Sequence, residues 1–338
     1  MIPIDYRFVN GISGDPATFC EILNSRDAFL FDLGQVDALS AKDLLKVRQV
    51  FVSHTHIDHF IGFDRLLRVN IPHGREIFLA GPAGFAENVR CRLKSYTWNL
   101  LDEGQLKFVV AEVGCDGDVS HYKISSDSDF ALEFIKSATN GLVWEDSSGK
   151  KVTACSLDHL VPCISYKVSL PRPDRLDLSE VSKLGWEPGP WVGKLQRAVV
   201  LGQETITIEG VDYKVPELSR KIFRAQHDYS LGYLTDVIFS RENIDKIAET
   251  FAGVDRIICD ASFRRADSVR AKERYHLTTY QAALLAAKVG GHLDVFHVSN
   301  IYGQTKEDSV VEAQSFYTEI ASKSEIEIDA LIATELSQ

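Results

Sequence analysis

The sequence lacks several features that would assign it to a specialised class of protein. Its 338 residues contain no run of about eighteen apolar residues, so we expect no membrane-spanning helix and no membrane partner. Six cysteines are present but no CxxC pair, which favours free thiols in a reducing cytoplasm over a disulfide framework. The opening residues have no basic stretch followed by an apolar segment, so we expect no signal peptide. Together these absences predict a cytoplasmic protein.

Positive charge is also scarce. The chain has 37 Lys and Arg residues against 48 Asp and Glu residues, and its net charge of -11 argues against broad, nonspecific affinity for nucleic acid. One segment departs from this balance, because residues 264–274 hold five cations and only two acids. This basic strip is either a solvated helix face or a local site for a negatively charged substrate.

Apolar segments that end in polar residues recur along the chain. Strands are predicted at 28–34, 50–52, 76–82, 106–113, 130–135, 152–157, 162–168, 231–236, 256–260 and 293–297, and helices at 85–101 and 278–288. Strands that alternate with helices indicate an α/β fold, and polar groups at several strand ends indicate one site along a sheet edge. Periodicity alone does not separate a four-layer αββα sandwich from a doubly wound sheet.

Residues 169–221 interrupt this pattern. We expect one domain over residues 1–338, with this stretch as an insertion. Its segment 184–195, LGWEPGPWVGKL, is rich in glycine, proline and tryptophan, which is typical of irregular structure. The insertion as a whole is neutral, with eight Lys/Arg and eight Asp/Glu residues. It is either a substrate-binding arm or a surface loop held by its two tryptophans.

The hexapeptide HTHIDH at residues 54–59 carries most of the chemical information. It follows the apolar residues 50–52, so it lies at the end of a predicted strand. Imidazole and carboxylate groups are ligands that suit zinc and similar divalent ions. In an extended turn His54 and His56 can point the same way, while Asp58 and His59 reach a second position. The motif therefore predicts a site for two metal ions, which is a more specific signal than a lone HxH.

This hexapeptide is the signature of the metallo-β-lactamase superfamily, which the chain resembles over most of its length, and the later segments most resemble ribonuclease Z. The resemblance implies the αββα sandwich and further metal ligands in a fixed order. On this basis His159 completes the first metal's set, His297 completes the second, and Asp236 bridges both ions. The expected ligands are His54, His56, Asp58, His59, His159, Asp236 and His297.

The expected cofactor is a pair of divalent ions, most simply Zn²⁺, although Mn²⁺ and Fe²⁺ accept the same ligands. Two such ions about 3.5–4 Å apart can share a water, lower its pKa toward neutrality and deliver a bridging hydroxide to the substrate. The resemblance suggests that Asp58 also accepts a proton from this water. No cysteine is needed as a nucleophile.

A second catalytic pair is expected from the ribonuclease Z resemblance. His276, in YHLTT, resembles the family's HST-type motif, in which a histidine acts on the scissile phosphate or the leaving group. Asp260, in CDASF, occupies the position where the family usually has glutamate in EATF. An imidazole held by a carboxylate is suited to act as general acid for a departing 3′-oxygen. The alternative is that both residues only cap neighbouring segments.

Four further residues are candidates for substrate binding. Arg270 and Arg274 belong to the basic strip that precedes His276. Thr278 and Thr279 stand at the predicted start of a helix, where they either donate hydrogen bonds to phosphate or serve as helix caps.

The resulting hypothesis is a dinuclear metal-dependent phosphodiesterase that cleaves RNA near a tRNA 3′ end. Ribonuclease Z proteins carry a similar LGxxPGPxxGKL segment, and an arm in that family clamps tRNA. Four segments depart from the family pattern, at 10–16, 31–35, 60–64 and 297–302. The alternatives are a hydrolase of a small phosphodiester, ester, thioester or lactone, and a noncatalytic binding protein. A homodimer is expected from the resemblance alone.

Overall fold

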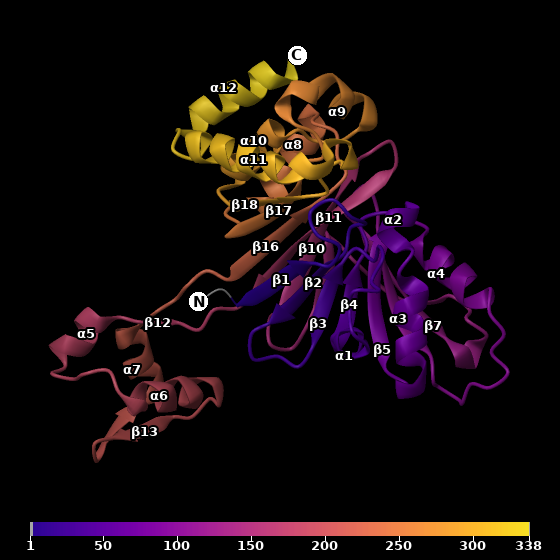
Figure 1. Cartoon of the computed structure of the whole chain (residues 1–338). Coiled ribbons are helices and arrows are strands. Elements are labelled where there is room, and N and C mark those ends of the chain that lie inside the picture. The colour runs from indigo at the N-terminus through magenta and orange to yellow at the C-terminus, as the bar shows by residue number, and fades with distance from the viewer. Residues whose placement is uncertain (1–2, 338) are drawn as a thin grey trace. The chain divides into compact units, whose positions relative to one another are not determined.

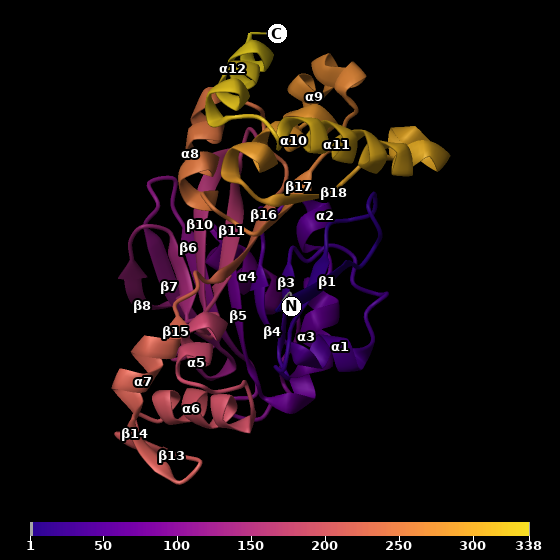
Figure 2. The same cartoon turned by 90° about the vertical axis from the view of Figure 1, so that its left-hand side faces the viewer.

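Two β-sheets and the helices outside them form most of the structure, a computed structural model that describes residues 3–337. Figure 1 and Figure 2 show the arrangement from two directions. The chain divides into a main unit, residues 3–170 with 229–337, and a smaller unit, Pro171–Asp228. Among the described residues no helix is long and apolar enough to cross a membrane, and all six cysteines are free thiols.

The first sheet has eight strands that follow each other in chain order, and its four central strands β3 to β6 are parallel. They are β1 (Ile4–Phe8), β2 (Thr18–Ile22), β3 (Ala28–Phe31), β4 (Val47–Phe51), β5 (Glu76–Pro82), β6 (Lys107–Val113), β7 (Val119–Ser125) and β8 (Glu133–Ala138). The outer face carries α1 (Ala41–Lys46), α3 (Phe63–Asn70) and α4 (Phe85–Lys94).

The second sheet has six strands in the order β18-β17-β16-β11-β10-β9. They are β9 (Leu142–Glu145), β10 (Lys151–Asp158), β11 (Pro162–Leu170), β16 (Tyr229–Leu234), β17 (Arg256–Asp260) and β18 (His292–Phe296). Its outer face carries α8 (Arg241–Phe251), α10 (Thr279–Val289), α11 (Lys306–Ile320) and α12 (Glu325–Leu336), with α9 (Ser268–Arg274) nearby.

Alternation of buried side chains along the strands creates three apolar layers between these four structural layers. Leu30 in β3 packs toward the first sheet's helices, whereas Phe29 and Phe31 pack between the sheets. Phe31 stacks on Tyr233 of the second sheet, with ring centroids 4.6 Å apart. Both faces of each sheet are therefore covered, and the expected αββα sandwich is confirmed.

Several predicted elements differ from the structure in their bounds, and two of these differences have a clear physical reason. The helix expected at 85–101 ends at Lys94, because the chain then folds back and Trp98 Nε1 donates to the carbonyl of Leu93. The strand expected at 130–135 begins only at Glu133. Phe130 is buried in a turn with a positive φ of 57°, so its apolar character reflects core packing rather than strand pairing.

The smaller unit has a core of its own. It contains β12 (Arg175–Leu176), α5 (Leu178–Lys183), α6 (Pro190–Val200), β13 (Thr205–Ile208), β14 (Val211–Lys214), α7 (Val215–Ile222) and β15 (Phe223–Arg224). Val181, Leu195 and Ile222 are fully buried at its centre. Pro190 occupies the first turn of α6, where its missing N–H costs nothing. The expected insertion 169–221 overlaps this unit, and its role as a substrate-binding arm stays a prediction.

Candidate metal centre

The HTHIDH segment forms a tight turn between strand β4 and the short helix α2 (Ile57–Phe60). The turn is held against the loop after β3, because Leu33 N donates to His59 O at 2.9 Å. Gly34 makes this contact possible, since a Cβ atom there would lie 2.3 Å from the carbonyl oxygen of Asp58. The backbone packing therefore fixes where the acid and the last histidine of the motif point.

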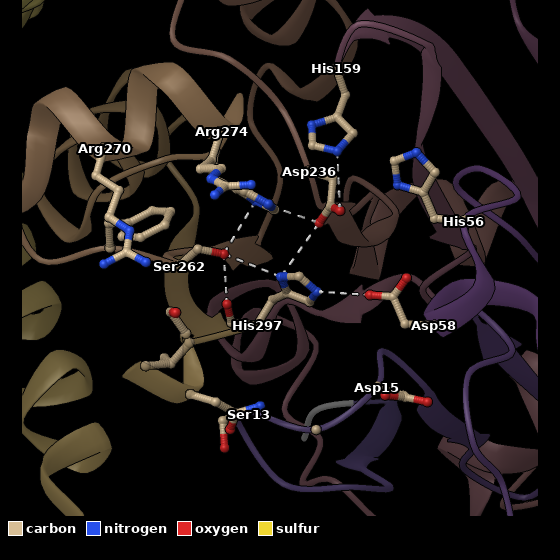
Figure 3. Close-up of a pocket in the computed structure, with 16 residues that line it drawn as sticks. Ser13, Asp15, His56, Asp58, His159, Asp236, Ser262, Arg270, Arg274 and His297 are labelled. Atoms are coloured by element: carbon tan, nitrogen blue, oxygen red, sulfur yellow. Dashed lines mark hydrogen bonds and ion pairs between the residues drawn. The ribbon is translucent and has the colours of Figure 1, made fainter. Parts of the chain in front are cut away.

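The structure brings the predicted ligands together in two groups. The ligand atoms of His54, His56, His159 and Asp236 all lie within 4.8 Å of one another, and the same holds for Asp58, His59 and His297. Asp236 lies between the groups: its Oδ2 is 3.7 Å from His54 Nε2 and 3.3 Å from His59 Nε2, and its Oδ1 is 3.5 Å from His297 Nδ1. Figure 3 shows Asp236 between His159 and His297, with His56 and Asp58 nearby.

Backbone conformation helps to aim these residues. Asp236 and His297 follow the ends of β16 and β18 and have positive φ angles of 45° and 57°. Left-handed conformations are uncommon for residues other than glycine, and they often occur at functional sites. This backbone conformation directs both side chains over the edge of the sheet. Its energetic cost is compensated by the contacts of the surrounding fold.

The two buried imidazoles of the motif fit the requirements of metal ligands. His54 Nε2 and His59 Nε2 are buried and have no hydrogen-bond partner among the described residues. Leaving such a nitrogen unsatisfied is costly, whereas coordination to a cation satisfies it. Their Nδ1 atoms are held, His54 by Ser53 Oγ at 3.0 Å and His59 by Asp32 Oδ2 at 2.8 Å. In each ring, Nδ1 thus has a hydrogen-bond partner while Nε2 keeps its lone pair for a cation, which is typical of metal-binding histidines.

Asp32 is a supporting residue that the sequence interpretation missed. Its carboxylate is fully buried and accepts hydrogen bonds from Ser53 N at 2.6 Å and Tyr233 Oη at 2.7 Å, besides its contact with His59. The available signal was its place directly after the buried strand β3, where a charged residue needs a partner. In the sequence, residues 31–35 stand out only as a departure from the family pattern.

A third group of polar side chains lies beside the two ligand sets. His276 Nδ1 is 3.0 Å from Oδ2 of the fully buried Asp260, the pairing expected from the sequence. Ser262, which was not predicted, donates from both N and Oγ to Asp260 Oδ1 at 2.7 Å. His276 also stacks on His297, with ring centroids 5.4 Å apart. The Asp260 carboxylate is therefore fixed by two donors of Ser262, and it in turn fixes the His276 imidazole.

An open cavity of about 460 Å³ gives access to this centre. Its wall includes His56, Asp58, His159, Asp236, His276 and His297, together with Arg270 and Arg274 of α9. A further part of the wall comes from the loops at 13–15 and 298–300. The ligand groups thus lie at a surface that a large substrate can reach.

Comparison with known proteins identifies the family. No family model matches the chain. A ribonuclease Z from Deinococcus radiodurans is 30% identical to it over 279 residues, which cover 81% of this chain and 82% of that protein. A ribonuclease Z from Anoxybacillus flavithermus is 26% identical over 94% of this chain and 91% of its own length. The chain belongs to the ribonuclease Z family. The prediction of a metal-dependent hydrolase is thereby confirmed.

Solved structures with the same fold support this assignment of the architecture. The short form of human tRNase Z superposes with a TM-score of 0.53 and 17% identity, over 88% of this chain and 93% of that one. A metallo-β-lactamase fold protein from Bacillus subtilis gives a TM-score of 0.54 and 12% identity, over 95% and 94%. At these identities the likeness concerns the fold alone.

In this ribonuclease Z family member the arginines of the basic strip have two kinds of surroundings. Arg270 and Arg274 line the cavity. Arg264 and Arg265 do not, and their guanidinium groups lie over aromatic rings, 4.5 Å from the centroid of Tyr302 and 3.7 Å from that of Tyr280. Only part of the strip is therefore available to a negatively charged substrate.

The threonines expected to bind substrate need a correction. Thr278 and Thr279 are fully buried and do not line the cavity. Thr278 caps α10, where its side chain accepts from Gln281 N, and Thr279 Oγ1 donates to Glu312 at 2.7 Å. Both hydroxyls are engaged in holding the helix, so neither is placed to contact a phosphate, and the capping alternative is the one that the geometry supports.

The local environment shifts the pKa values of the residues at the centre in different directions. Burial lowers the pKa of His54 to about 2, so this imidazole keeps a free lone pair. The neighbouring His297, whose Nε2 lies 3.9 Å from Asp58 Oδ2, lowers the pKa of Asp58 to about 2. Burial opposes the charge of Asp236, yet the neighbouring His297 and His59 hold the pKa of its carboxyl well below the usual range. Burial likewise opposes the charged form of His276, but the Asp260 carboxylate raises its pKa to about 9.

Proposed function

We propose that this protein is a dinuclear metal-dependent endonuclease that removes the 3′ trailer from precursor tRNA. The observation that carries the proposal is the pair of ligand groups that meet at Asp236 in an open cavity. It is supported by relatives that are named ribonuclease Z and by a structural neighbour named as a tRNase Z. The two arginines on the cavity wall provide positive charge where a phosphate chain would pass.

The metal ligands follow from the two groups. One ion would be held by His54, His56 and His159, a second by Asp58, His59 and His297, and Asp236 would offer one carboxylate to both. Two divalent cations at such a site lower the pKa of a water and neutralise charge on phosphate oxygens. Zn²⁺ is the ion we favour, because histidine and carboxylate ligands suit it, and Mn²⁺ and Fe²⁺ are outcomes of the metal analysis.

The chain's own residues supply the proton transfers. His276 would give its proton to the departing 3′-oxygen, and its raised pKa keeps it protonated at neutral pH. Asp260, fixed by Ser262, keeps the imidazole in place and stabilises its charge. Asp58, which stays ionised, would accept a proton from the attacking water once two bound cations made that water acidic.

One assay separates the proposal from its runner-up. Metal-loaded protein is offered a 3′-extended tRNA precursor and, separately, bis(p-nitrophenyl) phosphate. Cleavage of both substrates, each dependent on the same metal, supports the proposal. Cleavage of the small diester alone supports a small-substrate hydrolase. Inertness toward both, with two equivalents of metal found by elemental analysis, would exclude the proposal and leave an ester, a lactone or binding alone. Sedimentation velocity in the same buffer tests the homodimer that we also propose from the family resemblance.

A further inference from the structure

The cavity above the metal centre has two walls of different character. One wall is basic and comes from α9, which contributes Arg270 and Arg274 next to His276. The other wall comes from the loops at 13–15 and 298–300 and has no cation among its lining residues. Figure 3 shows the two arginines on one side of the metal ligands, with Ser13 below His297 and Asp15 below Asp58. Lys306 Nζ donates to Ser13 Oγ at 3.1 Å, but the charged side chain that lines the cavity on this wall is the carboxylate of Asp15.

Asp15 is the charged group of the second wall. It is partly exposed, and its carboxylate has no hydrogen-bond or ion-pair partner that the described residues supply. A carboxylate can only accept hydrogen bonds and repels phosphate oxygens. At the mouth of a site for a polyanion, such a group is expected to face a hydroxyl or amino group of the substrate rather than a phosphate.

The loop that carries Asp15 is held in place before any ligand binds. Asn10 Nδ2 donates to the carbonyl oxygens of Asp15 at 2.8 Å and of Gln35 at 2.7 Å. Gly14 packs on Asn10 so closely that a Cβ atom would lie 2.5 Å from Asn10 Cβ. A Cβ atom at Gly34 would lie 2.8 Å from Asp15 Cβ and 2.3 Å from Asp58 O, so Asp15 adjoins the backbone of a metal ligand. The backbone and Cβ of Asp15 are thus held in place, and its carboxylate is left free to accept a hydrogen bond.

If the proposed function holds, the position of the Asp15 carboxylate indicates which nucleotide of the RNA it contacts. His276 marks the side on which the 3′-oxygen departs, and the arginines stand on that side. Asp15 lies on the side of the cavity where Asp58 is, apart from the two arginines, as Figure 3 shows. The nucleotide on that side is the first of the trailer, joined to phosphorus through its 5′-oxygen. Its ribose offers a 2′-hydroxyl, the donor by which a protein distinguishes RNA from DNA.

We infer that Asp15 accepts a hydrogen bond from the ribose 2′-hydroxyl of the first trailer nucleotide and so makes the enzyme selective for RNA at that position. Three tRNA precursors test this, identical except that the first trailer nucleotide carries 2′-hydroxyl, 2′-hydrogen or 2′-O-methyl. The wild-type enzyme should cleave the hydroxyl form with a kcat/KM about tenfold above either other form, as expected for a hydrogen bond to a charged group. Each comparison is a ratio within one enzyme, so a general loss of activity cancels.

Variants assign the selectivity to the carboxylate. Asp15→Ala should cleave the three precursors at equal rates, and Asp15→Asn, which keeps a neutral acceptor, should retain a preference of only a few fold. Asp102→Ala, at an exposed acid outside the cavity lining, should keep the wild-type ratio. Thermal unfolding and metal content are measured for each variant.

The possible failures are distinguishable. A wild-type enzyme that cuts all three precursors alike, or an Asp15→Ala enzyme that keeps the tenfold ratio, would overturn the inference and leave the proposed function intact. Failure to cut any precursor while bis(p-nitrophenyl) phosphate is hydrolysed would remove the proposed function, and the inference with it.

Discussion

At the scale of single residues, His276 is the side chain whose role is most open to test. It is hydrogen-bonded to Asp260, but its ring also lies near Asp236 and His297, and these three could hold a cation themselves. We expect His276→Ala to retain both metal equivalents and to lose about 10²–10⁴-fold in kcat, because only proton delivery is removed. Elemental analysis and single-turnover cleavage of the precursor measure the two quantities. Loss of metal in this variant would show that His276 is a ligand.

Asp32 gives a complementary prediction, because it acts on the metal through another residue. Its carboxylate holds His59 Nδ1 and thereby fixes the orientation of the inner nitrogen. Asp32→Asn keeps the shape of the side chain but removes the charge, so we expect metal affinity to fall by about 10–100-fold. Competition with a chromophoric chelator measures this affinity, and Asp43→Asn, on a capping acid of α1 away from the site, serves as the control. An unchanged affinity would mean that Asp32 has a purely structural role.

At the scale of elements, the chain shows which patterns are informative before a structure is known. The strands around the site were predicted well, because an apolar run that ends in a histidine or an acid marks both the strand and the sheet edge. The expected helix at 85–101 failed after Lys94, since residues 95–101 owe their apolar character to packing back onto the helix end. Thr278 and Thr279 illustrate a different limit. A threonine at a helix start looks the same in sequence whether its hydroxyl caps the helix or faces a ligand.

Helix α9 is the element that presents the two arginines, and its position depends on a tyrosine outside the cavity. Tyr302 Oη donates to Asp267 at 2.5 Å, at the start of α9, and accepts from Arg264 N at 2.8 Å. Tyr302→Phe should therefore loosen α9 and lower kcat/KM for the tRNA precursor about fivefold, the worth of one good hydrogen bond. Hydrolysis of bis(p-nitrophenyl) phosphate does not depend on the arginines of α9, so its rate should change little. Equal losses on both substrates would place the effect at the metal centre instead.

At the scale of the whole molecule, the order of metal ligands along the sequence was the strongest guide. Seven side chains from four strand ends meet within two groups, although no spacing rule relates His159, Asp236 and His297 to the hexapeptide. The resemblance to a known family supplied that relation. What it could not supply was the supporting layer of Asp32, Ser53 and Ser262, because hydroxyls and acids at turns are common, and only contacts in space separate these from the rest.

The junctions of the smaller unit allow its contribution to be tested by clean removal. It is inserted between β11 and β16, which pair antiparallel, and the residues that flank it, Leu170 and Tyr229, are direct cross-strand partners. Replacing residues 171–228 by Asn-Gly would close a two-residue hairpin that this geometry accepts. If the unit is a second binding module for tRNA, the deletion should lower kcat/KM for the precursor by about 10²-fold or more. Hydrolysis of bis(p-nitrophenyl) phosphate and the metal content should remain close to those of the full chain. A deletion variant that is stable and still cleaves the precursor at the full rate would show that the unit has no part in binding it.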